Sequence, residues 1–273
     1  MGSVTIGLAL SGGTAKCVAH IGVIKAFEEH GIDIGCMSGT SGGSVVAALY
    51  AGGKSVPEIE RLADSMQWWQ LAGLTLPRLG FLSGDKISEF IIDQIGDIEF
   101  SDLRIPTVII ATDLTGNRKM VFSEGRVAVA CQASSSIPQI YSPVEIQGHS
   151  IVDGGLIEYL PVESLSLFGN VFKVGVNIGK SGVPSRKKPK HIIDVIMQVT
   201  GFVSQFNAEI SERAADFVIF PDLNRYNPFA LHKASEMIEI GYETAVRSMP
   251  GLKRAIRRHG SLAGRVRRRF ERG

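Results

Sequence analysis

The sequence predicts an α/β fold, a three-layer sandwich in which helices cover both faces of a central, mainly parallel β-sheet. Two observations lead to this prediction. Apolar runs of strand length alternate with segments of helical periodicity, and glycine-rich turns join the first two strand–helix pairs. A length of 273 residues, of which 44% are hydrophobic and 21% are charged, suits one globular domain with a large core.

The N-terminal part of the chain contains two strand–turn–helix units. The first is expected to comprise a buried strand at 4–10, a tight loop at 11–14 and a helix at 18–30 that Gly31 ends. The second is expected to comprise a strand at 32–37, a glycine-rich turn at 38–43 and a helix at 44–51. Such units build parallel sheets.

The remaining elements follow from shorter patterns. Residues 54–103 are expected to be mostly helical, except for an apolar segment at 68–77 that has no clear period. Further strands are expected at 106–111, 120–122, 150–152, 172–178 and 217–220, and further helices at 127–133, 191–212 and 233–248. The stretch at 180–190 is rich in Lys, Arg, Ser and Pro and resembles a linker.

The composition limits the setting of the protein. No run approaches the roughly 20 apolar residues that cross a bilayer, and the N-terminus lacks the pattern of a signal peptide or a myristoylation site. The three cysteines are far apart in apolar or small-residue surroundings, which favours buried thiols in a reducing compartment. The sequence therefore predicts a soluble cytoplasmic chain.

The charge is unevenly distributed along the chain. The net charge is +2, but nine of the 29 Lys and Arg residues and only one of the 27 acidic residues lie in 251–273. Apolar residues recur there at helical spacing, at Leu252, Ile256, Leu262, Val266 and Phe270. We expect a basic amphipathic tail that contacts anionic membrane surfaces, as a peripheral attachment on the inner face of the membrane. No motif supports binding to nucleic acid.

The turn around Ser41 fits the G-x-S-x-G pattern of a nucleophile elbow. Gly39 and Gly43 flank the serine, and the pattern lies between an expected strand and an expected helix, as the motif requires. In such a turn the serine hydroxyl is exposed for attack, and side chains at the flanking positions would clash as strand and helix approach each other. Ser41 is the candidate nucleophile.

Such a serine also needs donors for the negative oxygen that forms on the substrate. The loop Gly12–Gly13–Thr14 lies between a strand and a helix, where backbone N–H groups converge at a helix N-terminus. A nucleotide-binding loop is the alternative, but the spacing to Lys16 is too short for a P-loop. We favour an oxyanion hole.

The candidate base is Asp153, which ends an apolar strand and is followed by Gly154 and Gly155. A carboxylate in this position can enter a site, and the two glycines let another backbone approach closely. On its own the pattern favours an ordinary Asp-Gly turn over a catalytic base.

Three blocks in this order resemble the signature of the patatin-like phospholipase family: residues 10–24 around the glycine loop, residues 39–43 around Ser41, and Asp153–Gly155. Residues 111–116 and 133–138 also resemble family blocks, and the similarity extends over about 4–247. The resemblance implies an acyl-hydrolase domain over 1–250, followed by the tail at 251–273.

The resemblance further implies a Ser–Asp dyad in which Asp153 takes the proton of Ser41 directly, with N–H groups of Gly12, Gly13 and Thr14 holding the oxyanion. No metal or cofactor is implied. This sequence departs from the family's glycine-rich run at Thr14, Lys16 and Cys17, and from a frequent asparagine at Glu158 and Tyr159. A β-branched residue such as Thr14 is not expected to adopt positive φ.

The function that follows is hydrolysis of a lipid acyl ester, as by a phospholipase A or a lysophospholipase, through a covalent acyl-serine. Two alternatives remain: a non-catalytic or regulatory lipid-binding protein with the same fold, and an acyltransferase. A Ser-Asp-His triad would need a histidine after Asp153, at 191, 232 or 259. The aromatic segment at 68–82 is expected to be either a lipid-contacting flap or ordinary helix packing.

Overall fold

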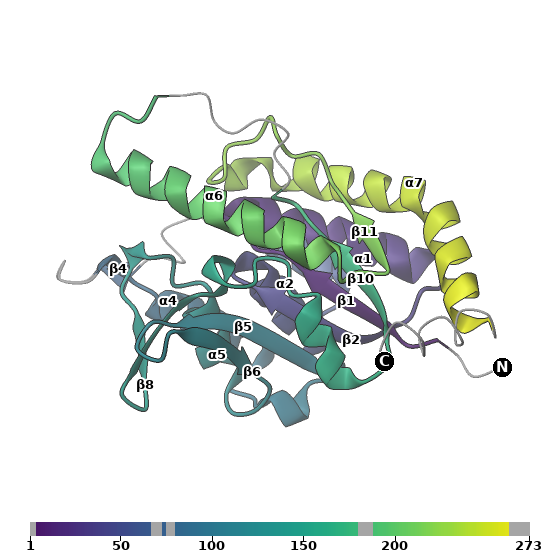
Figure 1. Ribbon diagram of the computed structural model, residues 1–273, viewed down its shortest axis with the longest axis horizontal. Coiled ribbons are helices and arrows are strands. Elements are labelled where there is room, and N and C mark those ends of the chain that lie inside the picture. The colour runs from purple at the N-terminus through teal and green to yellow at the C-terminus, as the bar shows by residue number, and fades with distance from the viewer. Residues whose placement is uncertain (1–3, 67–72, 75–79, 180–187, 262–273) are drawn as a thin grey trace.

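Five parallel strands form the centre of the computed structural model, which describes residues 4–66, 73–74, 80–179 and 188–261. They lie in the spatial order β11, β10, β1, β2, β5 (Figure 1). Their bounds are β1 (Ile6–Leu10), β2 (Ile34–Thr40), β5 (Thr107–Asp113), β10 (Phe172–Val176) and β11 (Phe217–Ile219).

Antiparallel strands extend the sheet beyond β5. Both β6 (Arg118–Phe122) and β9 (His149–Asp153) pair with β5, and β8 (Val144–Ile146) pairs with β9. The sheet is therefore mainly parallel, as the sequence predicts, and the structure adds an antiparallel edge.

Helices cover both faces, which confirms the predicted fold class. On one face pack α1 (Ala19–Glu29), α2 (Gly42–Ala51), α3 (Val56–Ser65), α4 (Asp85–Ile95), α5 (Val127–Ser134) and α7 (Ala234–Gly260). On the other lie α6 (Ile192–Glu212) and a 3₁₀ segment at Glu163–Phe168. Alternation along β1 makes the layers clear, because Leu8 and Leu10 join the core beneath α1 whereas Ala9 packs with Ala208 of α6.

A second, three-stranded sheet is absent from the sequence-based prediction. It consists of β3 (Gly73–Leu74), β4 (Gly80–Ser83) and β7 (Gln139–Tyr141), with β4 between the other two. Strands of two to four residues carry too few side chains for a period of two to be recognised. Most of the predicted flap at 68–82 lies outside the described residues.

The C-terminal helix differs from the predicted boundary at residue 250. α7 runs without interruption through Pro250 to Gly260. Leu252 is fully buried, Ile256 packs against the core, and Lys253 Nζ donates to the carbonyl of His30 at 3.0 Å. The first apolar positions assigned to the tail therefore face the protein, because they continue the buried stripe of α7. The predicted tail beyond 261 lies outside the described residues.

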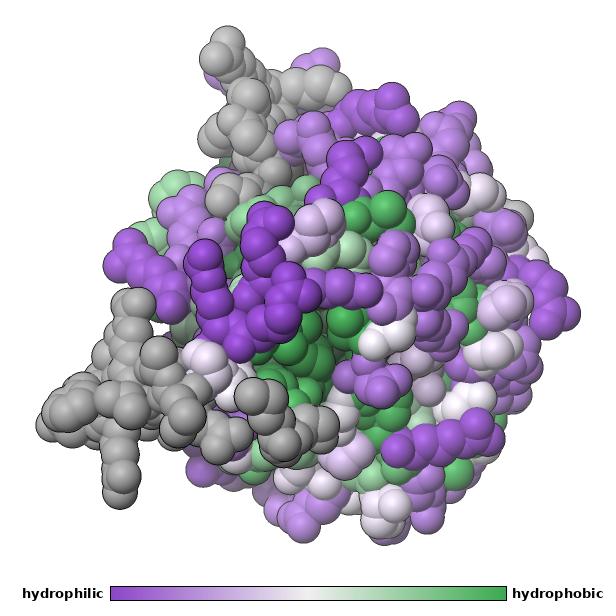
Figure 2. Space-filling model, turned by 90° about the vertical axis from the view of Figure 1, so that its right-hand side faces the viewer, coloured by the Kyte–Doolittle hydropathy of each residue, from purple (hydrophilic) through white to green (hydrophobic). Residues whose placement is uncertain are grey.

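At the end where β1 begins and α7 ends, the surface is largely hydrophilic around a smaller apolar area (Figure 2). The carboxyl ends of the parallel strands point to the opposite end, where α6 begins (Figure 1). Among the described helices, none combines the length and the apolar character needed to cross a bilayer.

Candidate active site

Ser41 lies at the turn from β2 into α2, with backbone angles of φ 51° and ψ −129°. Such angles are unusual for a residue with a side chain and carry strain. The flanking glycines allow the turn to close. A Cβ at Gly43 would lie 2.4 Å from the carbonyl oxygen of Leu10, and one at Gly39 would lie 2.6 Å from Cα of Ser44. The turn has the geometry of a nucleophile elbow.

Polar contacts hold this strained turn. The N–H of Ser41 donates to Oγ of Ser134 at 2.8 Å, and that hydroxyl donates to the carbonyl of Ile110 at 2.5 Å. On the other side, Oγ of Ser44 donates to the carbonyl of Ser41 at 2.6 Å. The sequence did not identify Ser134 as a site residue, although it lies in the family-like block at 133–138.

Strand register brings Asp153 to Ser41. Thr40 pairs with Ile110 on one side of β5, and Asp153 pairs with the next residue, Ala111, on β9. A Cβ at Gly154 would lie 2.2 Å from the carbonyl oxygen of Ile110, so only glycine lets the chain leave β9 this close to β5. The two predicted catalytic side chains, 112 positions apart in sequence, therefore share one site.

The carboxylate of Asp153 is buried and hydrogen-bonded. Its Oδ1 accepts from the N–H of Gly155 at 2.7 Å. Burial raises the pKa of Asp153 to about 6, while the hydrogen bonds from Ser41 and from the Gly155 N–H act in the opposite direction. At neutral pH the group is ionised yet more basic than an exposed aspartate, and it can accept a proton from Ser41.

The glycine loop adopts a conformation that the sequence did not predict. Thr14 has φ 52° despite its β-branched side chain. The loop is fixed on both sides, since the N–H of Gly12 donates to the carbonyl of Tyr159 at 3.0 Å and the N–H of Ala15 donates to that of Pro228 at 2.9 Å. The Gly12 N–H is thus engaged, which leaves Gly13 and Thr14 as the loop residues that can offer donors to an oxyanion.

Glu158 and Tyr159, where this sequence departs from the family's frequent asparagine, are both well packed. A Cβ at Gly12 would lie 2.9 Å from the ring of Tyr159 and one at Gly155 would lie 3.3 Å from it, so the ring fits between these backbones. The carboxylate of Glu158 accepts from the hydroxyl of Ser164 at 2.6 Å and from Lys119 Nζ at 2.9 Å. Both residues support the turn that carries Asp153.

Histidines take structural positions in the described part of the chain. The ring of His20 donates from Nε2 to the carbonyl of Ser11 at 2.9 Å, and burial lowers its pKa to about 4, so it is neutral. His259 packs edge-on against Phe172, and His191 precedes α6 on the surface. His232 lies in a 3₁₀ turn. The groups that hydrogen-bond to the Asp153 carboxylate are Ser41 and a peptide N–H, which does not match a triad.

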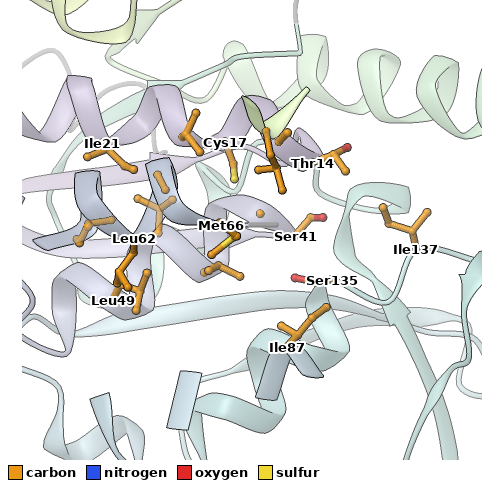
Figure 3. Close-up of a pocket in the computed structure, with 18 of the residues that line it drawn as sticks. Thr14, Cys17, Ile21, Ser41, Leu49, Leu62, Met66, Ile87, Ser135 and Ile137 are labelled. Carbon is orange, nitrogen blue, oxygen red and sulfur yellow. The ribbon is translucent and has the colours of Figure 1, made fainter. Parts of the chain in front are cut away.

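An apolar cavity opens beside Ser41 (Figure 3). Its empty volume is about 780 Å³, including the part open to solvent. Thr14 and Ser135 lie next to Ser41, and the cavity extends from there toward Ile21 and Leu49. The hydroxyl of Ser135 is buried without a hydrogen-bond partner in the described structure. The chamber suits an apolar chain attached to a polar group at the serine.

The described residues contain no group of three or more His, Cys, Asp or Glu side chains arranged to hold a metal ion. Ser41 and Thr14 line the cavity, Asp153 is hydrogen-bonded to Ser41, and Gly39, Gly43, Gly154 and Gly155 shape the backbone around them.

Comparisons with known proteins place these features in a family. An NTE family protein of Mycobacterium tuberculosis is 32% identical over 185 residues, which cover 66% of this chain and 51% of that protein. Lysophospholipase NTE1 of Saccharomyces cerevisiae is 29% identical over 259 residues, which cover 91% of this chain and 14% of that protein. The chain thus spans about half the length of the mycobacterial relative and a small part of the yeast one.

A solved structure has the same fold. VipD from Legionella pneumophila superposes with a TM-score of 0.64 at 14% sequence identity, over 92% of this chain and 67% of that chain. The sequence profile described as patatin-like phospholipase matches residues 8–166, which is more than half of the chain and includes Ser41, Asp153 and the glycine loop. The resemblance predicted from the sequence is confirmed, and the protein belongs to the patatin-like phospholipase family.

Proposed function

We propose that this protein is a lipid acyl hydrolase that cleaves a carboxylic ester through a covalent acyl-enzyme at Ser41, with Asp153 as the base. The observation that carries the proposal is the position of the two side chains. A serine in a strained elbow lines an apolar cavity, and a buried aspartate of raised pKa is hydrogen-bonded to it.

In the first half-reaction, Oγ of Ser41 attacks the carbonyl carbon of the ester while the Asp153 carboxylate takes the hydroxyl proton. The N–H groups of Gly13 and Thr14 stabilise the oxyanion, and each such donor typically contributes several kcal/mol to the transition state. The tetrahedral intermediate then expels the alcohol, which receives the proton from Asp153. The acyl group stays on Ser41 as an ester.

In the second half-reaction, a water molecule attacks the acyl carbonyl and Asp153 takes its proton. The second tetrahedral intermediate collapses by breaking the bond to Oγ of Ser41, and the proton returns from Asp153 to the serine. A carboxylic acid leaves. In each half-reaction Asp153 first accepts a proton and then releases it. A pKa of about 6, between that of a free carboxyl and neutral pH, favours both steps.

The cavity supports an acyl chain as the group that is bound. The side chains that line it beyond Ser41 are overwhelmingly apolar, among them Ile21, Leu49 and Leu62. The name lysophospholipase carried by the yeast relatives supports phospholipids or lysophospholipids as the class of substrate.

A non-catalytic lipid-binding role is the alternative of another class, suggested by Thr14 in the glycine loop. The loop nevertheless holds Thr14 at φ 52°, in the region that glycine would favour, and Thr14 lines the cavity next to Ser41. This conformation supports catalysis.

A fluorophosphonate ester tests the proposal, because it reacts with an activated serine. We expect labelling of Ser41 in the wild-type protein, detected by mass spectrometry, no labelling in Ser41→Ala, and labelling slowed at least about a hundredfold in Asp153→Asn. Hydrolysis of a short-chain ester should fall in parallel. If Ser41 is not labelled and Ser41→Ala retains full esterase activity, the proposal is wrong. Adding an alcohol acceptor distinguishes a transferase, which would form a new ester.

A further inference from the structure

The outer face of α6 carries an uninterrupted row of exposed apolar side chains. Its members recur every three or four residues, none of them is charged, and their exposed fractions are 41–71%: Ile192, Val195, Val199, Phe202, Phe206 and Ile210. At 1.5 Å per residue the row is about 27 Å long. Large apolar side chains are usually exposed singly, so a continuous row indicates a surface that another phase or molecule covers.

The inner face of α6 fixes the orientation of this row. Oγ of Ser204 donates to the carbonyl of Gly155 at 3.0 Å, and Nδ2 of Asn207 donates to that of Leu156 at 2.6 Å. Ala208 packs into the core beneath the helix. The helix is thus attached to the turn that directly follows Asp153, and its apolar row faces outward.

The surroundings of α6 favour a lipid membrane as the covering phase. The helix begins at the end of the molecule to which the carboxyl ends of the parallel strands, and hence Ser41, are directed (Figure 1). Lys188 and Lys190 are exposed just before the helix, where anionic headgroups would neutralise them. The opposite end of the molecule is largely hydrophilic and would remain in water (Figure 2).

A second copy of the chain is the other possible occupant, because spacings of three and four also describe a coiled-coil seam. The apolar character of α6 is broader than a seam, however. Ile196 and Val203 lie beside the row and are themselves partly exposed. An apolar band wider than a seam, next to basic residues, fits insertion between lipid headgroups better than pairing of two helices.

We propose that α6 docks on the surface of phospholipid membranes, with the row from Ile192 to Ile210 inserted among the lipids. The choice of lipid as partner rests on the proposed function, whereas the exposed row does not. Docking through α6 holds the turn after Asp153, to which Ser204 and Asn207 are hydrogen-bonded, next to the membrane-bound helix. This docking face is separate from Leu252 and Ile256 of the expected tail, which pack against the protein.

Sedimentation of the full chain with phosphatidylcholine vesicles, alone or mixed with phosphatidylglycerol, tests the proposal. The Ser41→Ala background makes the measurement independent of hydrolysis, so that failure of the proposed enzymatic function would not affect it. The test variant is Phe202→Ser with Phe206→Ser. The matched control is Leu114→Ser with Leu167→Ser, which removes two exposed apolar side chains outside α6.

We expect the Ser41→Ala protein with an unchanged α6 to bind both kinds of vesicle, and to bind more tightly to those that contain phosphatidylglycerol. The α6 variant should bind at least about tenfold more weakly, and the control should bind as the wild type does. Circular dichroism verifies folding. As a second measurement, an environment-sensitive fluorophore on Val199→Cys should shift to the blue on vesicles, and one on Leu167→Cys should not.

Three outcomes overturn the proposal. The first is absence of binding by the wild-type surface to either vesicle. The second is equal binding by the α6 variant and the control. The third is a dimer that the α6 substitutions convert to a monomer while vesicle binding is unchanged, which would assign the row to a second copy of the chain.

Discussion

Replacement of Asp153 by asparagine should abolish catalysis and stabilise the fold at the same time. Burial raises the pKa of this carboxyl from 3.8 to about 6, which means that the folded state holds the ionised form less favourably than the unfolded state does. At 1.36 kcal/mol per pH unit, the cost of ionising Asp153 in the folded protein is about 3 kcal/mol at pH 8. Asparagine has almost the same shape and no charge. Its carbonyl oxygen can accept from the Gly155 N–H, and its amide can donate to Ser41.

The pH dependence follows from the direction of the pKa change. Because the folded pKa lies above the unfolded one, the stabilising contribution of protonated Asp153 is complete below about pH 3.8 and is lost as the pH rises through about 6. The asparagine variant has no such loss. The difference in the free energy of unfolding, variant minus wild type, should therefore increase by about 2 kcal/mol between pH 4.5 and pH 8.

Urea denaturation of both proteins at pH 4.5 and pH 8 measures this difference. The contributions of other titrating groups to the unfolding free energy are the same in both proteins and cancel. For the wild-type protein, kcat/KM should rise with pH to a plateau above about pH 6, since the ionised form of Asp153 is the proposed base. A difference in unfolding free energy that stays constant with pH would refute the assignment of a desolvated, ionised base to Asp153.

Four further substitutions probe the cavity and the packing. Leu62→Trp should fill part of the cavity and shift the preference in ester hydrolysis toward shorter acyl chains; an unchanged chain-length profile would place the acyl group elsewhere. Ser135→Ala should raise KM about three- to tenfold without loss of stability, because its buried hydroxyl is free to bind the substrate; an unchanged KM would argue against that contact. Gly241→Ala should lower the free energy of unfolding by roughly 3 kcal/mol, since its Cβ would lie 2.0 Å from the carbonyl oxygen of Ala19. Gly251→Ala, in the same helix but with 3.4 Å of space, should be neutral or stabilising in the same urea titration.

The sequence predicted the elements with strong local patterns. The strand beginning near residue 4, the helix after the glycine loop and the turn at Ser41 were all expected close to where they lie, because apolar periodicity and glycine position are local properties. Contacts that cross the chain could not be predicted. The Ser134 hydroxyl supports the N–H of Ser41 across 93 positions, and Ser204 supports Gly155 across 49.

The orientation of α6 shows a second limit of local patterns. The helix was expected at 191–212, but its N-terminal half is apolar at most positions, so periodicity does not distinguish the inner face from the outer one. The polar contacts of Ser204 and Asn207 decide the orientation. Thr14 shows a third limit. Its propensity opposes positive φ, yet tertiary hydrogen bonds on both sides of the loop hold it there.

The structural support of the site extends well past the block that the family profile matches. That match ends at residue 166, but the glycine loop and the turn after Asp153 are held from beyond it. The N–H of Ile178 donates to the Ser11 hydroxyl, the Pro228 carbonyl accepts from Ala15, and α6 supports the carbonyl groups after Asp153. Positive φ at Ser41 and Thr14 costs on the order of 1–3 kcal/mol at each residue, and these supports help to offset that cost. A fragment that ends near 166 would retain the signature residues and lose the contacts that hold them in this geometry.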